Sequence, residues 1–345
     1  MRANLMSRSY SLKRAFSVKY NSNVPDICRQ FYKLIDRNKN NDIVITPYHW
    51  PDIDGVAGCY ALSELLRKLE CKNPRPLISQ TPQFEASWVL DKFKIHLNTV
   101  EDEYKEQMVI LVDVSDPVDI PNLIPTNNVI AVIDHRSYYN NKDFRNAFFC
   151  IDTVGSATSL VSLLYKYSSH QPSTVTADLL YLAIMSNTIK CKTHNTTKTD
   201  LEAVEWLENF IDINHDFVDE MFIAKSNVRN IYATINDDTS SKLQHINGMK
   251  TAVSQLEIIS AEQFIHNNYN LILNALNRIK SDRSAESIFL IVIDVKIGWT
   301  YLVFIDQSMQ HFVTENFETS HNEKFFIIKK IHTRKEIIQT LLNKS

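Results

Sequence analysis

The chain has 345 residues, of which 44% are hydrophobic and 22% charged, and its formal net charge is −3. This length and apolar content suit two domains rather than one ordinary core. The near-neutral charge gives no general bias towards nucleic acid or membrane surfaces, and no apolar run approaches the length of a membrane span. The five glycines form neither a GxxxxGK(S/T) nor a GxGxxG phosphate loop.

The cysteines indicate a reducing compartment. They are odd in number and lack CxxC spacing, which argues against a disulfide framework or a zinc cage. We therefore expect free thiols in a soluble, intracellular, cytoplasmic protein. The five positions are Cys28, Cys59, Cys71, Cys150 and Cys191.

The first 25 residues differ from the rest of the chain. They carry five basic residues and no acidic one, with several serines. This composition suits a mitochondrial-type transit segment with a cleavage site at "RAFS" (14–17), which would place the protein in the mitochondrial matrix once residues 1–16 are removed. It equally suits a flexible basic tail on a cytosolic protein. Neither interpretation assigns residues 1–25 to the fold.

From Asp42 the pattern alternates between strands and helices. Short runs that are apolar on both faces are typical of parallel strands covered by helices. We predict strands at 42–46, 108–116, 128–136 and 147–152, and helices at 55–70, 155–168, 174–188 and 197–210. Residues 26–210 are thus expected to form an α/β domain with a doubly wound, mostly parallel sheet.

A second, smaller α/β domain is expected at residues 222–345. The pattern loosens around 209–222 and then becomes regular again. The predicted strands are 250–258, 287–295, 299–305 and 324–330, with a long amphipathic helix at 261–280. We expect the functional site in the cleft between the two domains.

Three predicted strands end in carboxylates. Asp52 and Asp54 follow the first, Asp113 ends another, and Asp134 with His135 ends a third. Ligands of open parallel sheets bind beyond the carboxyl ends of the strands, so these side chains should share one crevice. An aspartate after a strand is often only a helix cap or a turn former. Three strand ends together favour a site for hard divalent cations, which bind carboxylate oxygens and imidazole.

The order of five short motifs resembles the DHH phosphoesterase superfamily. They are "PDID", "LVDVS", "IDHR", "GSAT" and "IMSNT". Within that superfamily the chain is most similar to the manganese-dependent (family II) inorganic pyrophosphatases and the related exopolyphosphatases. The resemblance runs from Asp42 to the C-terminus and includes "SKLQHING" (241–248) and "HTRKEIIQTLL" (332–342) in the second domain.

The resemblance implies roles for individual residues. Asp52 would bind one metal ion, Asp54 and His135 would bind a second, and Asp113 would bridge the two ions. The full implied metal set is Asp52, Asp54, Asp113, His135, Asn187 and His49. Asp134 and Arg136 would be catalytic, with Asp134 orienting its neighbours. The implied substrate-binding residues are Arg136, Ser156, Lys242, Arg334 and Lys335, in which guanidinium and ammonium groups suit phosphate oxygens.

Three positions depart from the family pattern. Tyr48 stands where the family has a histidine, and the adjacent His49 is one residue out of register. Arg136 replaces the second histidine of Asp-His-His, and an arginine binds phosphate but does not readily donate a proton. Asn187 replaces a metal-binding aspartate, and its amide oxygen supplies no charge. Fewer anions imply weaker metal binding.

Two classes of function therefore follow from the sequence. The first is a hydrolase that cleaves pyrophosphate or short polyphosphate with metal-activated water, using manganese, or else cobalt or magnesium. A variant of this class is a phosphodiesterase for short oligonucleotides or cyclic dinucleotides. The second is a catalytically impaired relative that binds phosphate ligands or partners and has a regulatory role. The expected partner is a small phosphate-containing molecule, not a membrane or a long nucleic acid, and a homodimer through an edge strand is possible.

Overall fold

The computed structural model describes residues 24–99, 107–121, 124–136, 142–240 and 242–344. The transit or tail interpretation of the first 25 residues therefore lies almost wholly outside the described residues. The last two of those residues belong to the first helix, which begins at Val24. The expected tail is therefore two residues too long.

The first half of the chain forms a six-stranded sheet in the order β3-β2-β1-β4-β5-β6, and every pairing is parallel. Strands β2 and β3 lie on one side of β1, and the later strands β4, β5 and β6 lie on the other side, so the strand order reverses at β1. The carboxyl ends of β1 and β4 thus flank the position where ligands of such sheets bind. The strands are β1 (Asp42–Thr46), β2 (Asn73–Ile78), β3 (Asn98–Thr99), β4 (Met108–Val112), β5 (Val129–Asp134) and β6 (Phe148–Ile151).

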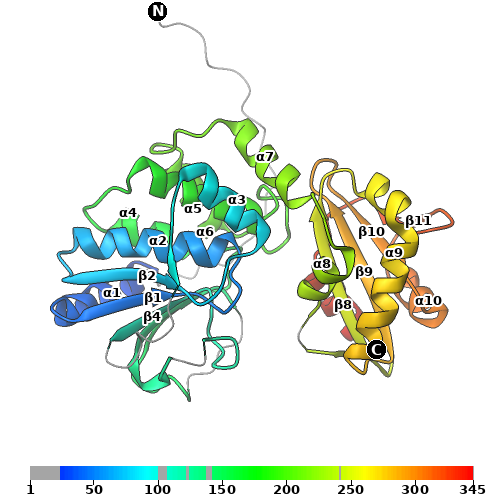
Figure 1. Cartoon of the computed structure of the whole chain (residues 1–345), viewed down its shortest axis with the longest axis horizontal. Coiled ribbons are helices and arrows are strands. Elements are labelled where there is room, and N and C mark those ends of the chain that lie inside the picture. Colours follow the sequence, from blue (N-terminus) through cyan, green and yellow to red (C-terminus); the bar gives the residue numbers. More distant parts are fainter. Residues whose placement is uncertain (1–23, 100–106, 122–123, 137–141, 241, 345) are drawn as a thin grey trace, which may run out of the picture.

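Helices cover one face of this sheet (Figure 1). Alternate strand residues such as Ile43, Ile45 and Val112 share a core with these helices. The residues between them, including Val44 and Leu111, pack instead with apolar side chains of the segments after β4 and before β6. Both faces are therefore buried, which explains the continuous apolar runs. The helices are α1 (Val24–Asn38), α2 (Ile53–Lys68), α3 (Phe84–Phe93), α4 (Ala157–Tyr167), α5 (Thr174–Asn187) and α6 (Lys198–Leu207).

The sequence patterns missed α1, β2 and α3. Strand β2 contains Pro74 and Pro76, and prolines argue against a strand inside a sheet because they cannot donate to the ladder. Here β2 has only the two-residue strand β3 beyond it, so it lies close to the sheet edge. Because β2 is not predicted, no predicted strand directly precedes α3, and the sequence pattern does not identify this helix either.

The second half contains another six-stranded sheet, in the order β11-β12-β10-β9-β8-β7. Only β8 and β9 are parallel, and the other pairs are antiparallel. Helix α9 packs on one face of this sheet. The elements are β7 (Gln244–Ile246), β8 (Met249–Ile258), α9 (Ala261–Asp282), β9 (Ser287–Asp294), β10 (Trp299–Phe304), α10 (Gln307–Glu315), β11 (Ser320–His321), β12 (Phe326–Ile328) and α11 (Arg334–Leu342). The expected strand at 324–330 is thus shorter than predicted.

Two helices that the sequence did not predict connect the halves. They are α7 (His215–Lys225), capped by the Asn214 side chain, and α8 (Ile231–Asp237). At the end of α7, the Lys225 ammonium lies 2.9 Å from Glu85 Oε2 on α3 and 2.9 Å from Glu257 Oε2 on β8. This triad therefore joins the two halves beside the cleft between them.

Two general expectations can be compared with the structure. None of the described helices combines the length and apolar character needed to cross a bilayer. All five cysteines are free thiols, and four of them are buried.

Gly58 brings α2 into close contact with the strand that carries the site. A Cβ added there would lie 2.6 Å from Val112 Cγ1 and 3.5 Å from Thr158 Cγ2. Val112 is a stiff, buried strand residue, so it cannot move aside freely. We expect Gly58→Ala to lower the free energy of unfolding by about 1–3 kcal/mol. Urea denaturation measures this, and a variant as stable as the wild type would contradict the close packing.

Candidate metal centre and active-site cleft

The predicted carboxylates meet at the carboxyl ends of β1, β4 and β5. Asp113 immediately follows β4 and has a φ angle of 60°, a left-handed conformation that is uncommon for residues other than glycine. Its N–H donates to the Ile133 carbonyl on β5 at 2.8 Å. This bond holds the backbone in the turn that follows the sheet, next to His135.

Asp54, Asp113 and His135 form the centre of the site. Each offers a ligand atom, and these atoms lie within 4.8 Å of one another. The Nε2 atom of His135 is 3.3 Å from Asp113 Oδ1 and 4.0 Å from Asp54 Oδ2. The Asp54 side chain is fully buried and that of Asp113 is 4% exposed, whereas that of His135 is 22% exposed. The imidazole therefore borders the accessible side of the group.

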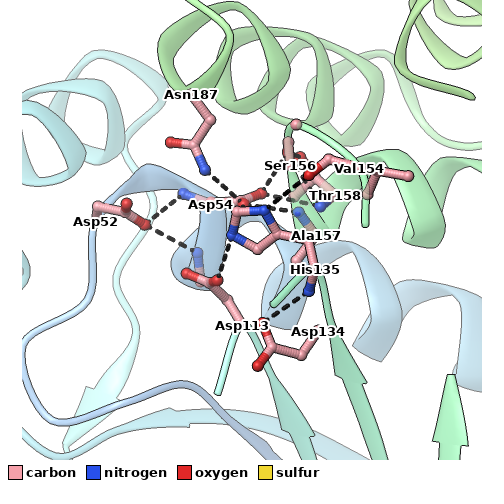
Figure 2. Close-up of polar contacts among 12 residues, drawn as sticks. Asp52, Asp54, Asp113, Asp134, His135, Val154, Ser156, Ala157, Thr158 and Asn187 are labelled. Atoms are coloured by element: carbon pink, nitrogen blue, oxygen red, sulfur yellow. Dashed lines mark hydrogen bonds and ion pairs between the residues drawn. The ribbon is translucent and has the colours of Figure 1, made fainter. Parts of the chain in front are cut away.

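The surroundings of His135 fix which nitrogen faces the carboxylates. Its Nδ1 lies 3.2 Å from the Val154 carbonyl, which can only accept, so Nδ1 carries the hydrogen and donates. Asp134 holds the backbone, because its Oδ1 accepts from the His135 N–H at 2.7 Å. In the neutral ring, Nε2 then presents its lone pair to Asp54 and Asp113, as metal-binding histidines do (Figure 2).

Asp54 is held by the N-terminus of α4. Its Oδ1 accepts from Ser156 Oγ at 2.7 Å and from the Thr158 N–H at 2.9 Å. Its Oδ2 accepts from the Ala157 N–H at 2.8 Å and from Asn187 Nδ2 at 2.7 Å (Figure 2). A helix N-terminus is a favourable place for a carboxylate, and these four hydrogen bonds hold the buried side chain in one orientation.

Asp113 provides the test of whether a cation fits. Its Oδ1 is buried and makes no hydrogen bond to any of the described residues, its nearest polar neighbour being His135 Nε2 at 3.3 Å. A buried carboxylate oxygen without a hydrogen-bond donor is costly. Burial raises the pKa of Asp113 to about 6, with the nearby Asp54 adding to the rise and His135 opposing it. Two carboxylates and an imidazole around an unsatisfied oxygen match the ligands that hard divalent ions prefer. The residues present therefore fit a metal ion.

Burial and charge act oppositely on His135. Burial alone lowers its pKa, but the contact with Asp113 and the neighbouring carboxylates outweigh burial and raise the pKa to about 10. The same negative potential that attracts a proton to Nε2 also attracts a metal ion.

The other predicted metal ligands lie outside this group. Asp52 caps α2, and its Oδ1 accepts from the N–H groups of Asp54 and Gly55 at 2.9 and 3.3 Å. Burial, then the charges of Asp113 and Asp54, raise the pKa of Asp52 well above its usual range. Asn187 donates to Asp54 as described above. His49 lies near Ser79, with Nδ1 3.5 Å from the Ser79 hydroxyl.

Tyr48, at the position where the family has a histidine, supports the loop between β1 and α2. Its hydroxyl accepts from the Asp52 N–H at 2.9 Å and from Gln83 Nε2 at 3.4 Å. Burial raises the pKa of this phenol well above its usual range, so it remains neutral. The tyrosine therefore positions Asp52 and carries no charge into the site.

The predicted phosphate-binding residues are only partly brought together. Arg136 donates from Nη1 to Asp134 Oδ2 at 3.2 Å and lines the cleft. Arg334 lines the opposite side, with Nη1 3.1 Å from Asp238 Oδ1. Ser156 directs its hydroxyl to Asp54 rather than into the cleft. Lys242 and Lys335 are exposed and are not among the lining residues.

The cleft has a volume of about 600 Å³ and lies between the two halves of the chain. Phe84, Glu85 and Lys225 were not predicted because they belong to α3 and α7, two helices that the sequence patterns missed. The available signal was the acidic Glu85 in the first turn of α3, because negative charge is favourable at a helix N-terminus. Unpredicted lining residues include Trp50, Gln83, Phe84, Glu85, Asp119, Lys225, Asp237, Asp238 and Glu257.

Several known proteins are similar to this chain. A model of the DHH family, N-terminal domain, matches residues 42–184. A manganese-dependent inorganic pyrophosphatase from Methanothrix thermoacetophila is 23% identical over 307 residues, which cover 87% of this chain and 97% of the relative. A probable manganese-dependent inorganic pyrophosphatase from Clostridium acetobutylicum is 24% identical over 255 residues, covering 73% and 82%.

Two solved structures share the fold. A Methanococcus jannaschii protein assigned to the family II inorganic pyrophosphatases aligns with a TM-score of 0.66 and 21% identity, covering 87% of this chain and 99% of that one. An exopolyphosphatase-related protein from Bacteroides fragilis aligns with a TM-score of 0.51 and 14% identity, covering 92% and 95%. At these identities the likeness shows the fold alone.

Proposed function

We propose that this protein, whose residues 42–184 match a model of the DHH family, N-terminal domain, is a metal-dependent hydrolase of phosphoanhydride bonds, with inorganic pyrophosphate as substrate and manganese as its ion. The observation that carries the proposal is the buried group of Asp54, Asp113 and His135, in which one carboxylate oxygen of Asp113 lacks a hydrogen bond among the described residues. The names of the pyrophosphatases that match almost the full chain favour the same substrate.

Asp54, Asp113 and His135 would hold the ion, with Asp52 and the amide of Asn187 close by. When bound, the ion supplies Lewis-acid activation of water and neutralises charge on the phosphate. Asp54 keeps its orientation through the N-terminus of α4, and His135 keeps its through Val154. These residues are therefore fixed before substrate arrives, as catalysis by electrostatic stabilisation requires.

Arg136 and Arg334 are placed to bind the phosphate groups from the two sides of the cleft. The neighbouring Asp113 and Asp134 outweigh the effect of burial on Arg136 and raise the pKa of its guanidinium further, so it stays charged. An arginine cannot deliver a proton at ordinary pH. Its role would be to neutralise the charge that develops on the leaving phosphate, and Asp134 would position it through their 3.2 Å contact.

Phosphate release tests this proposal. The wild-type protein would be incubated with pyrophosphate or tripolyphosphate and with manganese, cobalt or magnesium. We expect release from pyrophosphate that requires a divalent ion, that is greatest with manganese, and that a chelator abolishes. A folded protein that releases no phosphate from either substrate with any of the three ions would contradict the proposal.

Arg136→Lys separates charge from geometry. Lysine keeps the positive charge but loses the planar, two-pronged donor that fits a phosphate. We expect kcat/KM for pyrophosphate to fall roughly 10- to 100-fold, the size of a charge-assisted hydrogen bond. Steady-state kinetics measures this, with Arg29→Lys as a control because Arg29 is an exposed residue of α1. Equal activity of Arg136→Lys and wild type would remove Arg136 from the substrate site.

A second candidate, a weakly active relative that binds phosphate ligands and regulates a partner, is favoured by one observation. Asn187 brings an N–H group rather than an oxygen to Asp54, so the site has one carboxylate fewer than the family pattern implies. The double variant Tyr48→His, Asn187→Asp is expected to raise activity strongly if these changes disabled the enzyme. No gain in a folded double variant would count against this candidate.

A further inference from the structure

Two exposed aromatic side chains lie at the cleft. Trp50 is 36% exposed and Phe84 is 46% exposed, and both line the cleft. Among the described residues, the only other large aromatic side chain in the exposed group is Tyr167, at the end of α4. A single exposed aromatic residue needs no explanation. Here two of the three exposed aromatic side chains line the same polar cleft, and this indicates a surface for an aromatic ligand.

The backbone beneath these two rings is fixed. Gln83 donates from its N–H to the Pro51 carbonyl at 2.8 Å and from Nε2 to the Trp50 carbonyl at 3.2 Å. Gln83 immediately precedes Phe84, the first residue of α3. The loop after β1 and the start of α3 are thereby tied together. The backbone that carries the two rings is consequently held in place, which reduces the entropy lost when a ligand binds.

The charges of the cleft disfavour a long inorganic polyphosphate. Among the described residues, its lining contains six carboxylates and three cationic side chains. Each cation already has a carboxylate partner: Lys225 contacts Glu85 and Glu257, Arg334 contacts Asp238, and Arg136 contacts Asp134. A chain of many phosphates would meet uncompensated negative charge here. A ligand with few phosphates and a planar neutral group would meet less repulsion and gain stacking contacts.

The size of the cleft also favours a ligand that is larger than pyrophosphate. About 600 Å³ lies within the range of sites that enclose organic ligands and greatly exceeds the volume of a pyrophosphate ion. Trp50 is two residues from Asp52, which caps the helix that carries Asp54. Asn187 lines the same cleft and donates to Asp54 Oδ2 at 2.7 Å, so a ligand in the cleft can contact the aromatic rings and reach the edge of the candidate metal group.

We propose that Trp50 and Phe84 form a stacking subsite for the base of a nucleoside diphosphate, whose terminal phosphate lies at the metal group. This rests on the proposed function and extends its substrate class from pyrophosphate to nucleoside phosphoanhydrides. In the reaction, water oxygen bonds to the terminal phosphorus and the bridging P–O bond breaks. Its electron pair leaves with the nucleoside monophosphate, and a water proton passes to solvent.

The test compares ADP with pyrophosphate, which have the same number of phosphates. The measured quantity is kcat/KM for ADP divided by kcat/KM for pyrophosphate, in the presence of manganese. Stacking on aromatic side chains is worth enough for the Trp50→Ala, Phe84→Ala double variant to lower this ratio roughly 5- to 150-fold. Tyr167→Ala, an exposed aromatic residue outside the cleft lining, is the matched control and should leave the ratio unchanged.

A binding measurement separates failure of the subsite from failure of the proposed function. Calorimetric titration of the ADP analogue with an uncleavable methylene bridge into the protein with manganese, with Trp50 and Phe84 intact or replaced, reports stacking without turnover. Pyrophosphate hydrolysis with no binding of the analogue, or binding of the analogue that survives loss of both rings, would overturn the subsite. Binding that needs the rings, in a protein that hydrolyses neither compound, would support the subsite and overturn the proposed function.

Discussion

Asp113→Asn is expected to reduce manganese-dependent phosphate release from pyrophosphate by at least ~100-fold, since loss of a residue that merely supports a ligand already costs 10–100-fold in metal affinity or activity. The change removes the charge of Asp113, which among the described residues is the one carboxylate that has a buried oxygen without a hydrogen bond. Asparagine suits this position because it tolerates the left-handed backbone seen at Asp113. An alanine at this position would add backbone strain, so a loss of activity could come from lower stability as well as from lost metal binding.

Thermal denaturation of the same variant distinguishes lost metal binding from misfolding. A ligand that binds only the folded state raises the melting temperature as its concentration increases. We expect manganese to stabilise the wild type but not Asp113→Asn, while the chelated proteins both unfold cooperatively. Asp91→Asn, an exposed residue on α3, is the matched control. Full activity in Asp113→Asn would show that the ion, if required, binds elsewhere.

Asn187→Asp is expected to have opposite effects with and without metal. In the chelated protein, the new carboxylate loses the 2.7 Å hydrogen bond to Asp54 and faces it as a like charge. Two carboxylates that share a site repel each other, so the melting temperature should fall. With manganese the added charge should tighten binding, and the stabilisation by the ion should exceed that of the wild type.

The measurement for Asn187→Asp is a manganese titration followed by melting temperature and by calorimetry. A tenfold or greater gain in manganese affinity is the expected size, similar to the effect of residues that support metal ligands. Asn209→Asp serves as a control because Asn209 is an exposed residue just beyond α6. If manganese affinity were unchanged by Asn187→Asp, Asn187 would have no part in the metal site.

The sequence predicted the strands that carry the site because burial on both faces leaves a plain signal. The runs at β4 and β5 are nearly all apolar and stop at Asp113 and Asp134. The parallel arrangement then requires these strand ends to lie at one edge of the sheet. His135 followed from the same strand-end pattern and the resemblance added Asn187, and the structure brings both residues to Asp54.

The separate roles of neighbouring residues were not available from the sequence. Asp52 and Asp54 are two residues apart, and either could cap α2. The structure assigns the cap to Asp52 and joins Asp54 to the N-terminus of α4, about a hundred residues later in the chain. Such long-range bonds depend on how helices pack, which short-range patterns do not encode. Helix α3, with Phe84 and Glu85, was missed for a local reason: the prolines of β2 argue against a strand, so no strand was predicted directly before this helix.

The measurement that tests the central claim most directly is a crystal structure of the protein with manganese, with anomalous scattering recorded at the manganese absorption edge. We predict an anomalous peak bonded to Asp113 Oδ1 and His135 Nε2, with Asp54 in the same group. A well-ordered structure with no peak there, or with manganese bound only elsewhere, would contradict the assignment of this group as the metal centre.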